Sequence, residues 1–134
     1  AAVSRVAMFP GCRVTALCDL KRDCVEQAQK ALSDAKKPRA QEFIGDDAWR
    51  RLSDSPDVDV LYVATPIDWH TPMAIYGMKA GKHVLVEVIG CNTVDEGWEL
   101  VAARSRPDSS PVPHVRFRAN RNRSTSDSRG DRRG

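Results

Sequence analysis

The sequence predicts a doubly wound α/β domain, a parallel sheet covered by helices, over residues 12–103. Two observations predict this class. Segments with helical spacing of apolar residues alternate along the chain with short apolar runs that are typical of strands. Most of these runs are nearly continuous, as in parallel strands that are buried on both faces. Strict alternation of helix and strand favours a parallel sheet with crossover helices.

The N-terminal third of the chain is expected to hold a helix end, a strand and an amphipathic helix. Residues 1–9 have helical spacing and stop at Pro10-Gly11. Residues 12–18 alternate as a β-strand, and Asp19 follows that strand directly. Residues 21–35 form the amphipathic helix. Its apolar face consists of Val25, Ala28, Leu32 and Ala35.

A short edge strand and a short helix are expected next. Residues 42–45 are β-prone and lie between two breaks in the helical pattern. A helix through Trp49 and Leu52 should follow, and either Asp46 or Asp47 can cap it.

The next part of the chain repeats the strand-helix unit. The apolar run at residues 59–64 predicts a buried strand, and Thr71-Pro72 supplies an N-cap and a first-turn proline for the helix that ends at Gly81. Residues 83–86 predict another buried strand, which Glu87 follows. Thr93 and Glu96 form a capping box, which predicts a helix that continues through Trp98.

Residues 104–134 differ in composition from the rest of the chain. Of 21 basic and 18 acidic side chains in the protein, this segment holds 9 Arg and 3 Asp. Apolar periodicity ends there, so we expect a disordered, Arg/Ser-rich tail from about Arg106. Phe117 is its only aromatic residue, which argues against nucleic-acid binding. The predicted units are therefore a partial dinucleotide-binding domain at residues 1–103 and a low-complexity tail at residues 104–134.

Composition excludes several classes of protein. No run of 18 apolar residues exists, so no membrane span is expected. The spacing of the cysteines matches no common metal or redox motif, and we expect reduced thiols, with Cys12 and Cys18 buried in or beside a strand. The four cysteines are Cys12, Cys18, Cys24 and Cys91. We expect a cytoplasmic protein without a metal site, and the absence of an initiator Met leaves open a targeting signal upstream.

Polar side chains follow three of the predicted strands. Ligands of open α/β sheets bind beyond the carboxyl ends of the strands, so these positions are candidate site residues. Asp19 can accept hydrogen bonds from ribose hydroxyls, or it can be an acid that favours a helix N-terminus. His70 can bind a ligand or cap a helix. Glu87 closes an apolar strand and needs a ribose hydroxyl or a backbone amide as its partner.

Longer motifs run through these strand ends. They are AVSRVA at residues 2–7, VTALCDL at residues 14–20, DWHTPMA at residues 68–74, GKHVLVEV at residues 81–88 and WELV at residues 98–101. These motifs resemble the Gfo/Idh/MocA family, which includes glucose–fructose oxidoreductase and inositol dehydrogenase. They more closely resemble glycoside hydrolase family 109, whose members are NAD-dependent α-N-acetylgalactosaminidases on the same scaffold. The resemblance covers residues 1 to about 103.

The resemblance implies a Rossmann domain that binds NAD, and it assigns roles to particular residues. Asp19 would hold the adenosine ribose and favour NAD over NADP. Ile67, Asp68, Trp69 and His70 would line the cofactor site. Glu87 and Val88 would contact the side of the nicotinamide ribose. The catalytic residues would lie in a substrate domain beyond this chain, so the catalytic set is unknown.

The chain departs from the family pattern at several positions. Ile67 replaces a Trp, and Ile89 replaces a Pro. Val88 replaces the catalytic Lys of the ordinary dehydrogenases in the family. The first strand and the Gly-rich phosphate loop of the family would precede residue 1, and no GxGxxG occurs in the chain. We therefore expect a domain without its first strand, which alone binds NAD weakly or not at all.

The function that these residues imply is NAD-dependent glycoside hydrolysis. The resemblance implies transient oxidation of the sugar, elimination of the aglycone, addition of water and return of the hydride. The alternatives are an ordinary sugar or polyol dehydrogenase and an inactive gene fragment. The expected partners are a nicotinamide dinucleotide and, in the full-length protein, a sugar substrate. The sequence leaves the oligomeric state open.

Overall fold

The computed structural model describes residues 3–4 and 11–104 and confirms the predicted alternation of strands and helices. Most of the predicted first helix and of the predicted tail lies outside the described residues. The strands are β1 (Ala16–Asp19), β2 (Gln41–Ile44), β3 (Val60–Val63) and β4 (His83–Val86). The helices are α2 (Arg22–Asp34), α3 (Ala48–Ser53), the 3-10 turn η1 (Ile67–Trp69), α4 (His70–Lys79) and α5 (Val94–Arg104).

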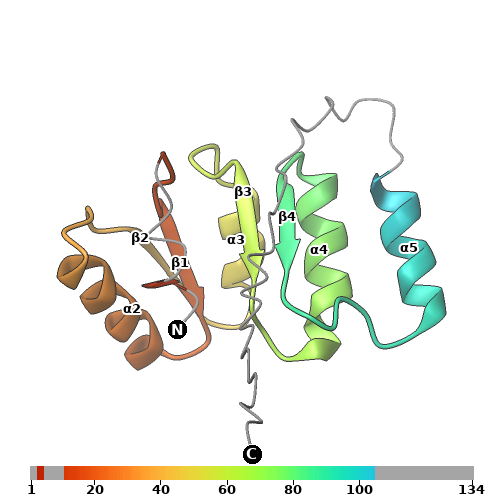
Figure 1. The fold of residues 1–134 in the computed structure, drawn as a ribbon, viewed down its shortest axis with the longest axis horizontal. Helices are drawn as coiled ribbons and strands as arrows, with labels where there is room; N and C mark the ends of the chain where they lie inside the picture. Colours follow the sequence, from red (N-terminus) through yellow and green to blue (C-terminus); the bar gives the residue numbers. More distant parts are fainter. Residues whose placement is uncertain (1–2, 5–10, 105–134) are drawn as a thin grey trace, which may run out of the picture.

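The described strands form two parallel pairs. β1 pairs with β2, with Asp19 opposite Ile44, and β3 pairs with β4, with Val63 opposite Val86. Within the described part of the chain, no strand joins β1 to β3. All four strands point the same way, so their carboxyl ends share the lower edge of the molecule in Figure 1. This arrangement confirms the predicted parallel α/β class.

The first strand pair packs against α2 through a small apolar core. Leu17 on β1 meets Val25 and Leu32 on α2, together with Ala40 at the entry to β2. The buried polar side chain of Gln29 donates to the Ala40 carbonyl oxygen at 2.6 Å and accepts from the Ala40 amide at 3.1 Å. The predicted apolar face was wrong at its end: Ala35 is exposed. Ala35 is the C-cap residue, where the helix no longer packs on the sheet.

The second strand pair packs against α4 at close range. Gly77 of α4 lies over β3, and a Cβ atom there would overlap Leu61 Cδ1 and stand 3.1 Å from Val84 Cγ2. The prediction that β3 and β4 are covered on both faces was wrong for the described residues. Val60, Tyr62 and Leu85 are exposed, because α4 covers only the face that carries Leu61 and Val63.

Helix α3 connects the two halves. It lies behind the sheet between the strand pairs in Figure 1 and contacts both β1 and α4. Its Trp49 ring packs edge-on against Tyr76 of α4, with the ring centroids 5.2 Å apart. The segment after α3 adds two hydrogen bonds, from Tyr76 Oη to Asp54 and from Lys82 Nζ to the Ser55 carbonyl oxygen.

Local predictions at the helix starts had mixed outcomes. The capping box is confirmed, because Thr93 Oγ1 accepts from the Glu96 amide and Glu96 Oε2 accepts from the Thr93 amide. The Thr71 N-cap was wrong, since η1 leads into α4 and the helix already begins at His70. Asp47 occupies the N-cap position of α3, but its side chain pairs with Arg50 instead of a backbone amide.

The first strand and its cysteines also differ from the prediction. β1 begins at Ala16, so Cys12 precedes it. Cys12 and Cys18 are exposed free thiols and not the buried ones expected. Cys18 is exposed because β1 turns Leu17 toward the α2 core and Cys18 toward the opposite face.

Candidate functional site: the carboxyl edge of the sheet

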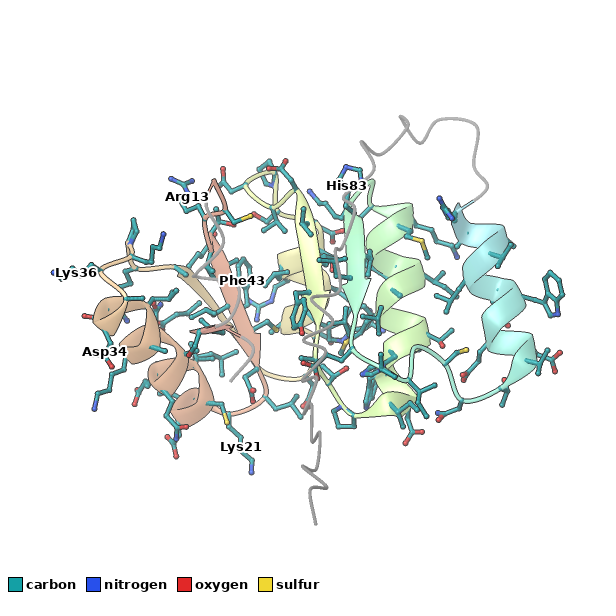
Figure 2. The ribbon with its side chains drawn as sticks, viewed as in Figure 1. Arg13, Lys21, Asp34, Lys36, Phe43 and His83 are labelled. Carbon is teal, nitrogen blue, oxygen red and sulfur yellow. The ribbon has the colours of Figure 1, made fainter. Side chains whose placement is uncertain are left out.

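The candidate site residues gather at one edge of the molecule. The chain segments that leave β1, β3 and β4 all lie at the lower edge in Figure 1, and Figure 2 places Lys21 at this edge and His83 at the opposite one. Parallel strands bring their carboxyl ends together, as ligand sites of open α/β sheets require. The sequence therefore predicted correctly that these three segments share an edge.

Asp19 ends β1 beside the first turn of α2. The residue is half-buried, and its Oδ1 accepts a hydrogen bond from the Lys21 amide at 3.0 Å. This bond fits the reading of Asp19 as an acid at a helix start. No partner for Oδ2 lies among the described residues, so the carboxylate keeps an acceptor for a further donor. Both readings of Asp19 thus stay compatible with its geometry.

The segment after β3 supplies Ile67, Asp68 and Trp69 on the short turn η1. Asp68 Oδ1 accepts from Asn92 Nδ2 at 2.8 Å, which ties this turn to the segment after β4. The Trp69 ring is about half exposed and lies 6.5 Å from the Trp49 ring, centroid to centroid. Trp69 therefore presents part of an aromatic surface at this edge.

His70 begins α4 and is buried, with 4% of its surface exposed. Its Nε2 lies 2.7 Å from the Thr65 carbonyl oxygen, and its Nδ1 lies 2.8 Å from the Ile89 carbonyl oxygen. Both ring nitrogens thus face backbone acceptors of the protein. The structure brings His70 to the predicted edge but places it beneath the segments that form the edge.

Glu87 follows β4, and Val88 comes next. The Tyr62 hydroxyl donates to Glu87 Oε1 at 2.9 Å, so the carboxylate that closes β4 is oriented from the neighbouring strand. Val88 is 97% exposed, the most exposed of the large apolar side chains at this edge. An aliphatic side chain in that position offers contact surface and no proton-transfer group.

Sequence reasoning missed two residues that organise the edge. Asn92 binds Asp68 through its side chain, and its backbone amide donates to Glu96 Oε2 at 2.6 Å. Tyr62 was assigned only to a buried strand. The capping box could have drawn attention to Asn92, because a carboxylate at the third helical position reaches back to the amides before the helix. Nothing in the local pattern connects Tyr62 with Glu87, 25 residues later.

The donor set suits a dinucleotide better than a metal. Half-buried carboxylates accept hydrogen bonds from ribose hydroxyls, and the exposed Trp69 and Val88 offer apolar surface to a flat ring. Among residues 3–4 and 11–104, no group of His, Cys, Asp and Glu could hold a metal ion. No helix in the described part of the chain is long and apolar enough to cross a membrane.

Comparison with known protein families and curated proteins places the chain among oxidoreductase-fold proteins. The family model described as the Gfo/Idh/MocA oxidoreductase family, with an NAD-binding Rossmann fold, matches residues 4–107. A glycosyl hydrolase family 109 protein of Bacteroides thetaiotaomicron is 45% identical over 101 residues, which is 75% of this chain and 22% of that protein. The alpha-N-acetylgalactosaminidase of Bacteroides fragilis is 39% identical over 101 residues, 74% of this chain and 23% of that enzyme. The chain thus spans about a fifth of the length of these relatives.

Solved structures show the same fold. An oxidoreductase domain protein from Kribbella flavida superposes with a TM-score of 0.58 at 31% identity, covering 76% of this chain and 26% of that one. A 3-ketoreductase from Actinomadura kijaniata, crystallised with NADP and TDP-benzene, gives a TM-score of 0.64 at 24% identity. That likeness covers 77% of this chain and 29% of the ketoreductase.

Proposed function

Because this chain belongs to the Gfo/Idh/MocA family of oxidoreductases with an NAD-binding Rossmann fold, we propose that it forms the dinucleotide site of an NAD-dependent glycoside hydrolase. The dinucleotide-binding unit that we propose spans residues 1–103. The proposed reaction rests on one observation, the residue at position 88. Val88, just after β4, is an exposed aliphatic residue, whereas the resemblance places a lysine there in ordinary dehydrogenases of the family.

The two ends of the dinucleotide would meet different strand ends. Asp19 would accept hydrogen bonds from the adenosine ribose, and its negative charge would disfavour a 2′-phosphate. Ile67, Asp68 and Trp69 would border the cofactor from the η1 turn. Glu87, which the Tyr62 hydroxyl orients, would accept a hydrogen bond from the nicotinamide ribose. Val88 would contact the nicotinamide on its ring side.

The chemistry divides between cofactor and protein. A bound dinucleotide would supply reversible hydride transfer to and from the sugar, the chemistry that makes elimination of the aglycone possible. The residues of this chain would bind and orient the dinucleotide. Val88 has no proton to give or take, so proton transfer to or from the sugar must come from groups elsewhere in the enzyme.

A domain exchange tests the proposed reaction. The 101 residues of the Bacteroides fragilis alpha-N-acetylgalactosaminidase that align with this chain would be replaced by the matching residues of this chain. With NAD present, the chimera should hydrolyse p-nitrophenyl α-N-acetylgalactosaminide without net formation of NADH, because the hydride returns to the sugar. Val88→Lys in the chimera is the matched variant for the dehydrogenase alternative.

Two outcomes would contradict the proposal. A chimera that accumulates NADH with a free sugar and releases no p-nitrophenol would instead be a dehydrogenase. A chimera that binds NAD but has lost hydrolysis would show that this site does not serve the glycosidase reaction.

A further inference from the structure

A single buried side chain joins the two segments that leave β3 and β4. His70 contacts the Thr65 carbonyl oxygen through Nε2 at 2.7 Å and the Ile89 carbonyl oxygen through Nδ1 at 2.8 Å. The ring therefore bridges backbone positions that are 24 residues apart in sequence, at the carboxyl end of each strand of the β3–β4 pair. We call this arrangement the His70 bridge.

The chemistry of the bridge requires an imidazole. A carbonyl oxygen only accepts, so each ring nitrogen must present an N–H for its bond to form. In the imidazolium form both ring nitrogens carry an N–H, so both hydrogen bonds form. In either neutral tautomer only one nitrogen carries an N–H, so only one of the two bonds forms. The amide of Asn or Gln carries both of its N–H groups on one nitrogen, so neither side chain can donate in two opposed directions.

Two other side-chain hydrogen bonds connect the same part of the edge. Asp68 and Asn92 form an exposed hydrogen bond of 2.8 Å, and Thr71 reaches Glu96 at the long distance of 3.4 Å. The His70 bonds are shorter than the Thr71 bond and come from a side chain that is 4% exposed, so solvent competes less for its ring nitrogens. Because it combines two short bonds with a buried ring, the His70 bridge holds the two segments at a fixed separation.

We propose that His70 is a positioning residue that sets the spacing between the Thr65–Trp69 and Glu87–Ile89 segments and so shapes the nicotinamide half of the site. The assignment of that half rests on the proposed function. Because both of its ring nitrogens face backbone carbonyl oxygens, His70 would act on the site through these two segments.

The test compares three forms of the full 134-residue chain. They are the wild type, His70→Asn and the matched variant His83→Asn, which changes an exposed histidine at the opposite edge (Figure 2). Amide hydrogen exchange would be followed in residues 65–69 and 87–92, and NMR titrations would use NAD and 5′-AMP. His70→Gln, which can keep one of the two bonds, serves if His70→Asn does not fold.

We expect at least tenfold faster exchange of both segments in the His70 variant and no change in α2 or in the His83 variant. The affinity for NAD should fall at least fivefold while that for 5′-AMP is unchanged, because 5′-AMP lacks the nicotinamide half. In the wild type, ring N–H signals should be visible for His70 and not for His83, since a buried hydrogen-bonded N–H exchanges slowly.

Three results would overturn the proposal. They are unchanged exchange in both segments, an equal loss of NAD and 5′-AMP affinity, and ring signals of His70 that match those of His83. If the wild type binds neither nucleotide, as expected of a domain that lacks its first strand, the exchange and ring signals by themselves decide whether the bridge holds the two segments, and the chimera described above decides the proposed function.

Discussion

At the scale of single residues, the carboxyl edge depends on side chains that are held by hydrogen bonds to the protein around them. Asp19 is held by the Lys21 amide, Glu87 by the Tyr62 hydroxyl and His70 by two carbonyl oxygens. A side chain fixed before the ligand arrives loses less conformational entropy on binding. These contacts therefore favour a preformed edge.

The two readings of Asp19 make different predictions. Asp19→Asn keeps an oxygen for the Lys21 amide but removes the charge, so we expect the dissociation constant of the chimera for NAD to rise about tenfold, with the unfolding free energy changed by less than about 0.5 kcal/mol. Asp23→Asn, at an exposed acid in the first turn of α2, is the control. Titration with NAD measures the dissociation constant of each variant, and urea unfolding measures its stability. Equal dissociation constants in all three proteins would leave Asp19 as an acid that only supports the helix start.

Cys18 should be the slowest of three exposed thiols to react. Although Cys18 is an exposed residue, partial desolvation of its thiol and the neighbouring Asp19 raise its pKa to about 11, and Arg51 acts in the opposite direction. Since the thiolate is the nucleophile, alkylation of Cys18 by iodoacetamide at pH 8 should be at least about tenfold slower than that of Cys12 and Cys24.

The pH dependence of Cys18 has a defined sign. A pKa above the ordinary value of 9.0 means that the folded chain disfavours the thiolate. Alkylation should therefore accelerate as pH rises toward 11, and the stability that Cys18 contributes should decline over the same range. Mass spectrometry of alkylated peptides at a series of pH values checks this. Rates at pH 8 that are equal for Cys18, Cys12 and Cys24 would refute it.

At the scale of elements, helices α4 and α5 are held in different ways. α4 buries His70, Thr71, Ala74 and Gly77 against the second strand pair. Helix α5 buries none of its residues among the described part of the chain and packs mainly on α4, with a capping box at its start. Its exposed apolar residues Val94, Trp98 and Val101 thus add little to the stability of this part of the fold.

Gly77 should be intolerant of a side chain, and Gly97 should accept one. The Cβ of Gly77→Ala would overlap Leu61, which is buried and cannot move freely, so we expect a net loss of about 1 kcal/mol after the gain in helix propensity. The Cβ of Gly97→Ala would meet only Cys91 Sγ at 3.6 Å, so α5 should gain about 0.5–1 kcal/mol. Urea unfolding measures both variants. If Gly77→Ala were as stable as Gly97→Ala, the close packing of α4 on β3 would not be limiting.

At the scale of the whole molecule, the described fold consists of two strand pairs connected through α3. Trp49 contacts Trp69 and Tyr76, and the segment after α3 binds Tyr76 and Lys82. Since no described strand joins β1 to β3, these contacts carry much of the coupling between the adenosine side and the nicotinamide side of the proposed site.

Removing the Trp49 ring should uncouple the two halves. We expect Trp49→Ala to lower the unfolding free energy by about 2–3 kcal/mol, less than for a fully buried ring because Trp49 is half-buried. Hydrogen exchange in β3 and β4 should then no longer follow that in β1 and β2. The control is Trp98→Ala on α5, a ring that is 68% exposed and should change stability by less than about 0.5 kcal/mol. Equal effects of the two substitutions would contradict this role of α3.

Some features could be predicted because their causes are local in sequence. The capping box needs only Thr93 and Glu96, three residues apart, and the alternation of elements follows from the spacing of apolar residues. The position of Asp19, His70 and Glu87 at one edge follows from the parallel order of the strands. The start of α4 was missed because the η1 turn brings the chain into helical geometry before Thr71.

The sequence by itself determined the order of the elements, the parallel class of the sheet and the edge where polar residues gather. The tertiary structure decided which faces those residues use. Local periodicity cannot show that only one face of β3 is covered, that Cys18 is exposed, or that both His70 nitrogens are taken by carbonyl oxygens. Each of these depends on contacts between segments that are distant in sequence, and such contacts form only when the chain has folded.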